Sequence, residues 1–194
     1  MARLGVSTID VLMLHRPDYL MNPVEVAGAF DQLHQAGKVR EFGVSNFRPS
    51  QVALLQRCLP RRLCVHQIES SLLQLAALED GVLDQCQTDQ LTPMAWSPLA
   101  GGLLGDRVHG LLPGQRGYRA EGVRPVLDAL AANFGVSRAQ VALAWLLKHP
   151  ARIQPVVGSV RPESIRDLAG ATELNLSHDD WYRLLVAARG VALP

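Results

Sequence analysis

The chain has 194 residues, of which 48% are hydrophobic, and a formal net charge of +1 at pH 7. This length supports one sizeable hydrophobic core, and the balanced charge argues against a nucleic acid or an anionic membrane as a partner. No apolar run approaches the length of a membrane span, and the first residues lack a signal-peptide pattern, so we expect a cytoplasmic protein.

The three cysteines are Cys58, Cys64 and Cys86. Their number is odd and their spacing includes no Cys-x-x-Cys pair. We therefore expect reduced thiols, with neither a disulfide framework nor a zinc site.

Short β-rich runs alternate with helical patterns along the chain. Strands are predicted at Ile9–Leu14, Arg40–Val44, Cys64–Gln67, Pro93–Trp96 and Gln154–Val157. The first helix is predicted at residues 23–36, with Asn22 as its N-cap, Pro23 in its first turn and Gly37 after its end.

Further helices are predicted at residues 49–59, 77–88 and 123–134, and a glycine-rich loop spans residues 101–117. The next helix opens with a capping box of Ser137 and Gln140 and stops before Pro150. One more helix begins after Pro162, and a last one follows Ser177 and Asp180, which also suit a capping box. This alternation predicts an α/β fold with a parallel sheet in one domain, residues 1–194.

The stretch IDVLMLHRPDYL, residues 9–20, places a histidine at the end of a buried strand. Pro17 cannot donate to a ladder, so the strand stops near His15. Two interpretations are open: His15 fastens a loop, or it is a catalytic or ligand-binding group at the loop face of a barrel or sheet.

Chemistry in parallel α/β folds lies just beyond the C-terminal ends of the strands. Those ends carry His15; Ser45 and Asn46; Gln67 and Glu69; Trp96 and Ser97; and Gly158, Ser159 and Arg161. The polar side chains suit a planar ligand with an amide edge, and Trp96 could cover its face. The loop after Gly158 leads into a helix, which suits a phosphate, and Arg161 could add a charged contact.

Each of these residues also has a purely structural interpretation. Asn46 and the Ser97-Pro98 pair could be turn residues, Trp96 a core aromatic residue, and Gln67 a buried amide with satisfied hydrogen bonds. Their coincidence at successive strand ends favours a binding site.

The segments GKVREFGVSNF, LMLHRPD, HQIES, MAWSPLAGGLL and PVVGSVRPESIRDL occur in the order found in aldo-keto reductases. The resemblance covers essentially the whole chain. It implies a (β/α)₈ TIM-barrel fold, of which this chain holds about the last five βα units, and the reduction of aldehydes and ketones with NADPH.

The resemblance also implies a role for each strand-end residue. His15 resembles the active-site histidine that orients the substrate carbonyl. The expected cofactor-binding residues are Ser45, Asn46 and Gln67 at the nicotinamide carboxamide, Trp96 on the nicotinamide ring, Ser97, Leu99 and Gly101 along the pyrophosphate, Gly158, Ser159, Arg161 and Arg166 at the 2′-phosphate, and Asp167 near the adenine. Leu168 stands where the family often has an asparagine, and Gly158 where some members have a lysine, so NADH is a possible alternative to NADPH.

The family's catalytic aspartate, tyrosine and lysine precede the histidine in sequence. No tyrosine or lysine precedes His15, and Asp10 lies within a strand. We therefore expect a truncated barrel, as a piece of a longer chain, a decayed relative, or a short protein whose open edges are covered in a homo-oligomer. Two functions remain open: a reductase of small carbonyl compounds, and a non-catalytic NADP-binding or accessory module.

Overall fold

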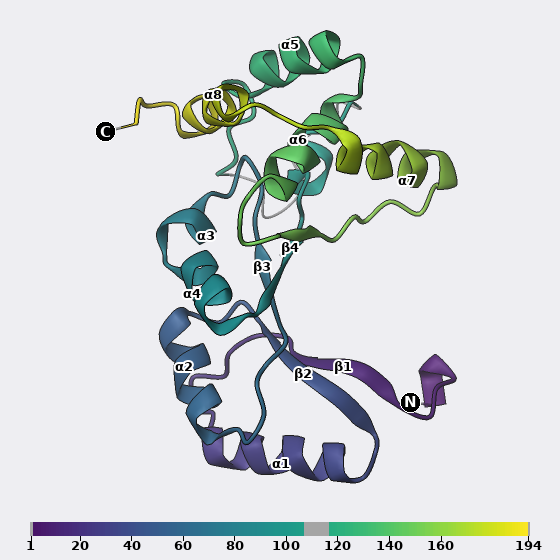
Figure 1. Cartoon of the computed structure of the whole chain (residues 1–194), viewed down its shortest axis with the longest axis vertical. Helices are drawn as coiled ribbons and strands as arrows, with labels where there is room; N and C mark the ends of the chain where they lie inside the picture. Colours follow the sequence, from purple (N-terminus) through teal and green to yellow (C-terminus); the bar gives the residue numbers. More distant parts are fainter. Residues whose placement is uncertain (1, 107–116, 194) are drawn as a thin grey trace. The chain divides into compact units, whose positions relative to one another are not determined.

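A computed structural model describes residues 2–106 and 117–193 (Figure 1). Its five strands form one sheet in the order β1-β2-β3-β4-β5, which is also their order along the chain. Strands β1, β2 and β3 pair in parallel. The predicted α/β fold with five parallel strands is confirmed. Part of the glycine-rich loop predicted at residues 101–117 lies outside the described residues.

The chain divides into two compact units. Unit 1 contains Met1–Ile68 and Leu78–Met94, and unit 2 contains Glu69–Ala77 and Ala95–Pro194. The chain passes into unit 2 within β3 (Val65–Glu69), returns to unit 1 within α3 (Ala76–Glu79) and passes into unit 2 again within β4 (Thr92–Trp96).

Unit 1 contains the first βα repeats. Its elements are η1 (Ala2–Leu4), β1 (Ile9–Leu14), α1 (Pro23–Gln35), β2 (Val39–Ser45), α2 (Pro49–Cys58), α4 (Val82–Asp89) and most of β3 (Val65–Glu69) and β4 (Thr92–Trp96). Asn22 caps α1 as predicted, since its side chain accepts a hydrogen bond from the Val24 N–H. Helix α1 packs against β2 and α2 (Figure 1), and the rings of Phe30 and Phe42 stack with centroids 4.0 Å apart in the core.

The helix predicted at residues 77–88 is instead two short helices, α3 (Ala76–Glu79) and α4. Gly81 lies between them with φ +81°. This left-handed backbone interrupts the helical hydrogen bonds, and glycine adopts it without a steric penalty. The apolar periodicity continued across Gly81, so the pattern alone did not reveal the break.

Unit 2 contains the later helices. Its elements are η2 (Ala100–Gly102), α5 (Arg124–Phe134), α6 (Arg138–Leu147), β5 (Gln154–Pro155), α7 (Pro162–Ala169), η3 (Gly170–Glu173) and α8 (His178–Arg189). Helix α6 packs against α5, α7 and β5. The indole rings of Trp145 and Trp181 stack 5.1 Å apart, and each indole N–H donates to the other residue's carbonyl. This pair joins α6 to α8.

Two local predictions for unit 2 need correction. Strand β5 ends at Pro155, two residues earlier than predicted: the Val156 N–H still donates to the Ala95 carbonyl oxygen of β4 at 2.8 Å, and Val156 and Val157 then line a cavity. In α6, Ser137 does accept from the Gln140 N–H, but the Gln140 side chain bonds to Asp167 instead of returning to the N-cap backbone. Asp167 on α7 therefore takes the place of the Ser137 backbone as the partner of the Gln140 side chain.

Within residues 2–106 and 117–193, no single helix has both the length and the apolar character needed to cross a membrane. Helices α5 and α6 meet that criterion only when taken together, and they are bent by 97° at their junction.

Candidate functional site

Four predicted site residues of unit 1 gather at the ends of β1, β2 and β3. The Asn46 side-chain amide donates to the His15 carbonyl oxygen at 3.3 Å and to Ser45 Oγ at 3.0 Å. The Asn46 backbone N–H donates to the Gln67 carbonyl oxygen at 2.9 Å. Asn46 thus links the C-terminal ends of β1, β2 and β3, which parallel pairing brings to one edge of the sheet.

The backbone at Asn46 is left-handed, with φ +60°. Asparagine tolerates this conformation better than most residues, so Asn46 also serves as the turn residue after β2. Ser45 is buried, Gln67 is half-buried, and Asn46 and His15 are exposed. The turn therefore leaves the Asn46 and His15 side chains accessible to a ligand.

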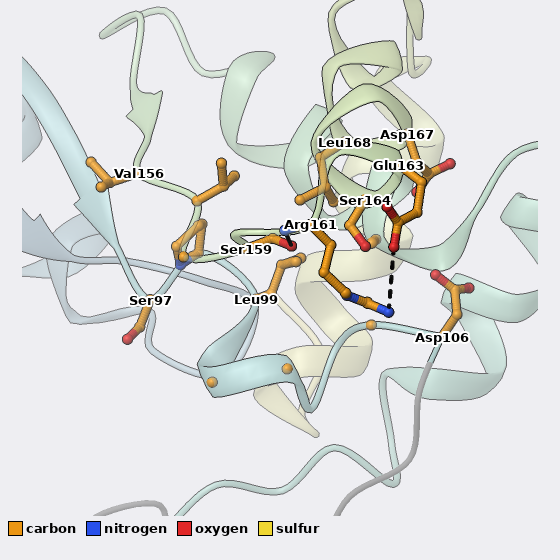
Figure 2. Close-up of a pocket in the computed structure, with 17 residues that line it drawn as sticks. Ser97, Leu99, Asp106, Val156, Ser159, Arg161, Glu163, Ser164, Asp167 and Leu168 are labelled. Carbon is orange, nitrogen blue, oxygen red and sulfur yellow. Dashed lines mark hydrogen bonds and ion pairs between the residues drawn. The ribbon is translucent and has the colours of Figure 1, made fainter.

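A cavity of about 690 Å³ lies in unit 2, beyond the ends of β4 and β5 (Figure 2). One part of its lining comes from the loop that follows β4, another from the loop between β5 and α7, and a third from α7 itself. The lining residues are Ser97, Pro98, Leu99, Gly101, Gly102, Gly105, Asp106, Ala139, Val156, Val157, Gly158, Ser159, Arg161, Glu163, Ser164, Asp167 and Leu168.

The cavity therefore contains seven of the nine unit 2 residues that the sequence predicted. These are Ser97, Leu99, Gly101, Gly158, Ser159, Arg161 and Asp167. Trp96 and Arg166 lie outside the lining that the described residues form. Trp96 is half-buried at the end of β4, and Arg166 lies on an exposed face of α7.

The charged groups of the cavity are mixed in sign. The Arg161 guanidinium lies 3.9 Å from the Glu163 carboxylate, and both side chains are solvent-accessible (Figure 2). Asp106 and Asp167 add two more carboxylates to the lining. Arg161 is also the N-cap of the eight-residue helix α7 and makes no side-chain cap, so its side chain satisfies none of the first-turn N–H groups of that helix.

The loop after β4 has an unusual backbone. Ser97 and Ala100 have φ values of +51° and +48°, and Gly101 and Gly102 have +62° and +95°. Left-handed conformations are unfavourable for residues with a Cβ and cluster at functional sites, where surrounding contacts maintain them. The glycines were expected from the sequence, whereas the strain at Ser97 and Ala100 was not.

Several lining residues were missed by sequence analysis. Asp106 follows the segment MAWSPLAGGLL closely, and Glu163 and Ser164 lie within PVVGSVRPESIRDL. Their closeness in sequence to the expected phosphate-binding residues could have identified them as lining residues. Ala139 lies in the first turn of α6, and no local pattern links that turn to the cavity.

Tyr118 is the described tyrosine nearest in sequence to the glycine-rich loop, and its hydroxyl donates to Glu69 Oε1 at the end of β3. Burial raises the pKa of the Tyr118 phenol well above its ordinary value, and the hydrogen bond and charge of Glu69 raise it further. The phenol is therefore held protonated as a donor to Glu69. Tyr118 thus fastens its loop to β3 and is a poor acid.

Comparison with known proteins places these observations in a family. The model of the aldo/keto reductase family matches residues 1–187. The 6-dehydroglucose reductase of Novosphingobium aromaticivorans is 44% identical over 194 residues, covering 100% of this chain and 61% of that protein. Oxidoreductase YdhF of Escherichia coli K12 is 41% identical over 196 residues, covering 98% of this chain and 61% of that protein.

A solved structure shows the same relationship. The thermostable aldo-keto reductase Tm1743 superposes with a TM-score of 0.84 at 26% identity, over 96% of this chain and 62% of that one. The chain thus spans about 61% of the length of the relatives it matches. From the family match over residues 1–187 and this likeness to part of a barrel, the chain belongs to the aldo/keto reductase family.

Proposed function

We propose that this chain binds NAD(P)H and takes part in the reduction of small aldehydes or ketones to alcohols. The observation that carries the proposal is the unit 2 cavity, where the phosphate-binding loops implied by the resemblance line one space. Aldo-keto reductases generally use NAD(P)H, which supports the same assignment.

The cavity has the size and chemistry for the adenosine-phosphate part of the cofactor. Its volume of about 690 Å³ lies within the range of about 300–1,000 Å³ typical of small-molecule sites. Arg161, the hydroxyls of Ser159 and Ser164, and the N-terminal amides of α7 are donors suited to phosphate. Leu99, Val156 and Leu168 add apolar surface suited to a base or a sugar face.

The strand-end residues of unit 1 suit the carboxamide of a nicotinamide. Ser45, Asn46 and Gln67 together offer hydroxyl and amide groups that both donate and accept hydrogen bonds. In unit 2, Trp96 offers an aromatic face of the kind that stacks on a planar ring. We assign Ser45, Asn46 and Gln67 of unit 1 to the carboxamide, and for Trp96 the assignment to the nicotinamide ring rests on the resemblance alone.

His15 is proposed to hold the substrate carbonyl oxygen. When bound, the reduced nicotinamide supplies a hydride to the carbonyl carbon, and negative charge develops on the oxygen. An imidazole N–H at His15 can donate to that oxygen, and a positioned donor of this kind contributes substantially to rate. The alcohol also requires a proton, which the resemblance assigns to a tyrosine with no counterpart before His15 in this sequence.

Arg161→Ala tests the assignment of the cavity. We expect the dissociation constant for NADPH to rise about tenfold to a hundredfold, because a hydrogen bond to a charged group contributes about 1.5–3 kcal/mol. NADH lacks the 2′-phosphate, so its dissociation constant should change less. Isothermal titration calorimetry with each nucleotide measures both values.

Arg183→Ala is the matched control, since Arg183 lies on α8 and pairs with Asp180 outside the cavity. It should leave both affinities unchanged. Equal losses for NADPH and NADH in Arg161→Ala would remove Arg161 from the 2′-phosphate site.

The substrate and the cellular setting belong to the same proposal. The 6-dehydroglucose reductases among the relatives make a sugar-derived aldehyde the first substrate to test.

We further propose that residues 1–194 belong to one barrel domain, that the protein is cytoplasmic, and that it self-associates. NADPH binding without carbonyl turnover would favour the non-catalytic NADP-binding module.

A further inference from the structure

The first turn of α6 contacts two parts of the cavity lining at once. Toward α7, Ser137 Oγ donates to Asp167 Oδ2 at 2.7 Å, and Gln140 Nε2 donates to the Asp167 carbonyl and carboxylate oxygens at 2.7 and 2.8 Å. Ala139, between them in sequence, lines the cavity itself. This turn therefore fixes α7 relative to α6.

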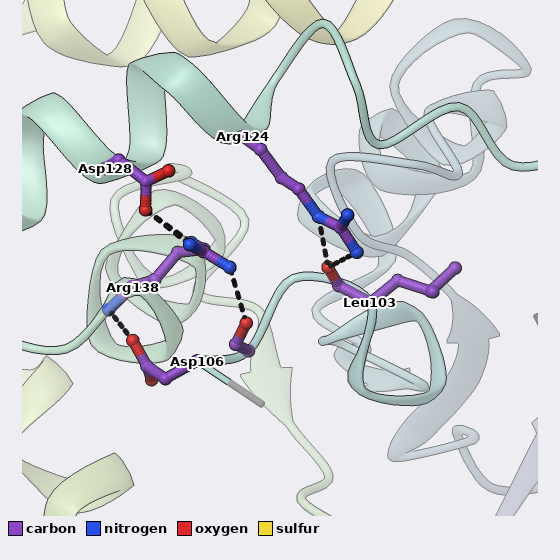
Figure 3. A network of polar contacts seen from close by, with 6 residues as sticks. Leu103, Asp106, Arg124, Asp128 and Arg138 are labelled. Atoms are coloured by element: carbon purple, nitrogen blue, oxygen red, sulfur yellow. Dashed lines mark hydrogen bonds and ion pairs between the residues drawn. The ribbon is translucent and has the colours of Figure 1, made fainter. Parts of the chain in front are cut away.

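Arg138, in the same turn, holds the loop that follows β4 (Figure 3). Its backbone N–H donates to Asp106 Oδ1 at 2.9 Å, and its Nη1 donates to the Gly105 carbonyl oxygen at 2.8 Å. Both loop residues line the cavity. One residue thus binds the end of the loop through its main chain and its side chain.

The remaining guanidinium donors of Arg138 are fixed by α5. Nε and Nη2 both donate to Asp128 Oδ1, at 2.8 and 2.5 Å (Figure 3). The Arg138 side chain is only 15% exposed, whereas that of Asp128 is 55% exposed. A planar guanidinium held by several acceptors loses little further freedom, so its contact with Gly105 is well oriented.

The loop needs such an external support. Ser97, Ala100, Gly101 and Gly102 have a left-handed backbone, and the short 3₁₀ turn η2 is the one helical element of the described part of the loop. Arg124 at the start of α5 adds a second anchor, since Nε and Nη2 donate to the Leu103 carbonyl oxygen at 3.2 and 3.1 Å. The side chains of Leu103 and Leu104 are buried. Arg124 of α5 and Arg138 of α6 therefore hold the backbone of the loop at the Leu103 and Gly105 carbonyl groups.

We propose that Arg138 is a positioning residue that holds the backbone of residues 101–106 as the pyrophosphate-binding wall of the cavity. This rests on the proposed function for the identity of the ligand, but the support of the loop is a property of the free protein. Arg138 acts through Gly105 and Asp106 and does not itself line the cavity.

The test compares Arg138→Met and Arg138→Lys with the unaltered chain, using NADPH and adenosine 2′,5′-bisphosphate as probes. The bisphosphate lacks the pyrophosphate and the nicotinamide, so it depends mainly on the loop before α7 and on α7. We expect Arg138→Met to raise the dissociation constant for NADPH about tenfold and that for the bisphosphate less than about threefold. The dissociation constant of Arg138→Lys for NADPH should lie between those of the unaltered chain and Arg138→Met, because lysine keeps the charge but lacks the planar set of guanidinium donors.

Hydrogen exchange of the free protein provides a readout independent of any nucleotide. In Arg138→Met, amides of residues 101–106 should exchange faster, and those of α7 should keep their rates. Arg183→Met is the control for loss of an arginine elsewhere in unit 2. Equal loss of both probes, or unchanged exchange in the loop, would overturn the inference. If the unaltered chain binds neither probe, the proposed function fails, and the exchange rates still decide the role of Arg138.

Discussion

Gly43→Ala is expected to destabilise unit 1 by about 1–3 kcal/mol, the usual cost of overpacking a well-packed core. Gly43 lies in β2, paired with Met13 on β1 and with Val65 on β3. A Cβ at this position would lie 2.8 Å from the Val65 carbonyl oxygen and 2.3 Å from Val65 Cγ2. The valine side chain could rotate away, but the carbonyl belongs to the paired strand, so the strands themselves must separate.

Urea unfolding followed by far-UV circular dichroism measures this loss. Far-UV circular dichroism is preferred to tryptophan fluorescence because Trp96, Trp145 and Trp181 all lie in unit 2. Gly28→Ala is the control: Gly28 is an exposed position within α1, and a Cβ there meets no atom within 4 Å. Since alanine is a better helix former, this variant should gain up to about 1 kcal/mol. A Gly43→Ala chain as stable as Gly28→Ala would contradict the close approach of the strands.

The elements that the sequence predicted well are those specified by local patterns. Strand β1 begins and ends where its apolar run does, and α1 is bounded by Asn22 and Gly37 as expected. The departures arise where a side chain finds a distant partner or where one residue breaks a continuing pattern. Gln140 was expected to cap its own helix but bonds to Asp167, and the helix at residues 77–88 divides at Gly81.

The candidate site likewise contains residues that local patterns identify and residues that they do not. Residues at strand ends could be listed from the sequence, because parallel strands bring those ends to one edge. Arg138 could not, since Gly105 and Asp128 lie 33 and 10 residues away and no periodicity links them. His66 is a similar case: alternation in β3 predicts that it is buried, but not that its ring nitrogens form no hydrogen bond of normal geometry with the described residues.

Unit 1 is expected to lose about 3 kcal/mol of stability from the titration of His66 as the pH falls from 7 to 4. His66 is fully buried in β3, and neither ring nitrogen forms a hydrogen bond of normal geometry with a described residue. Burial lowers the pKa of His66 from 6.5 to about 4, and the backbone of Phe47 opposes the shift only in part. Between these two values the unfolded chain binds a proton that the folded chain does not, so stability rises with pH across this window and falls as the solution is acidified.

The measurement is the free energy of unfolding at pH 7, 6, 5 and 4 for the unaltered chain and for His66→Leu. Leucine cannot titrate and leaves no buried ring nitrogen without a partner, so the variant should be at least as resistant to acid. The difference between the two chains should therefore grow by about 3 kcal/mol toward pH 4. His178→Gln, at an exposed position of α8, should retain the dependence of the unaltered chain. Parallel curves for the unaltered chain and His66→Leu would show that the His66 ring is solvated or paired in the folded protein.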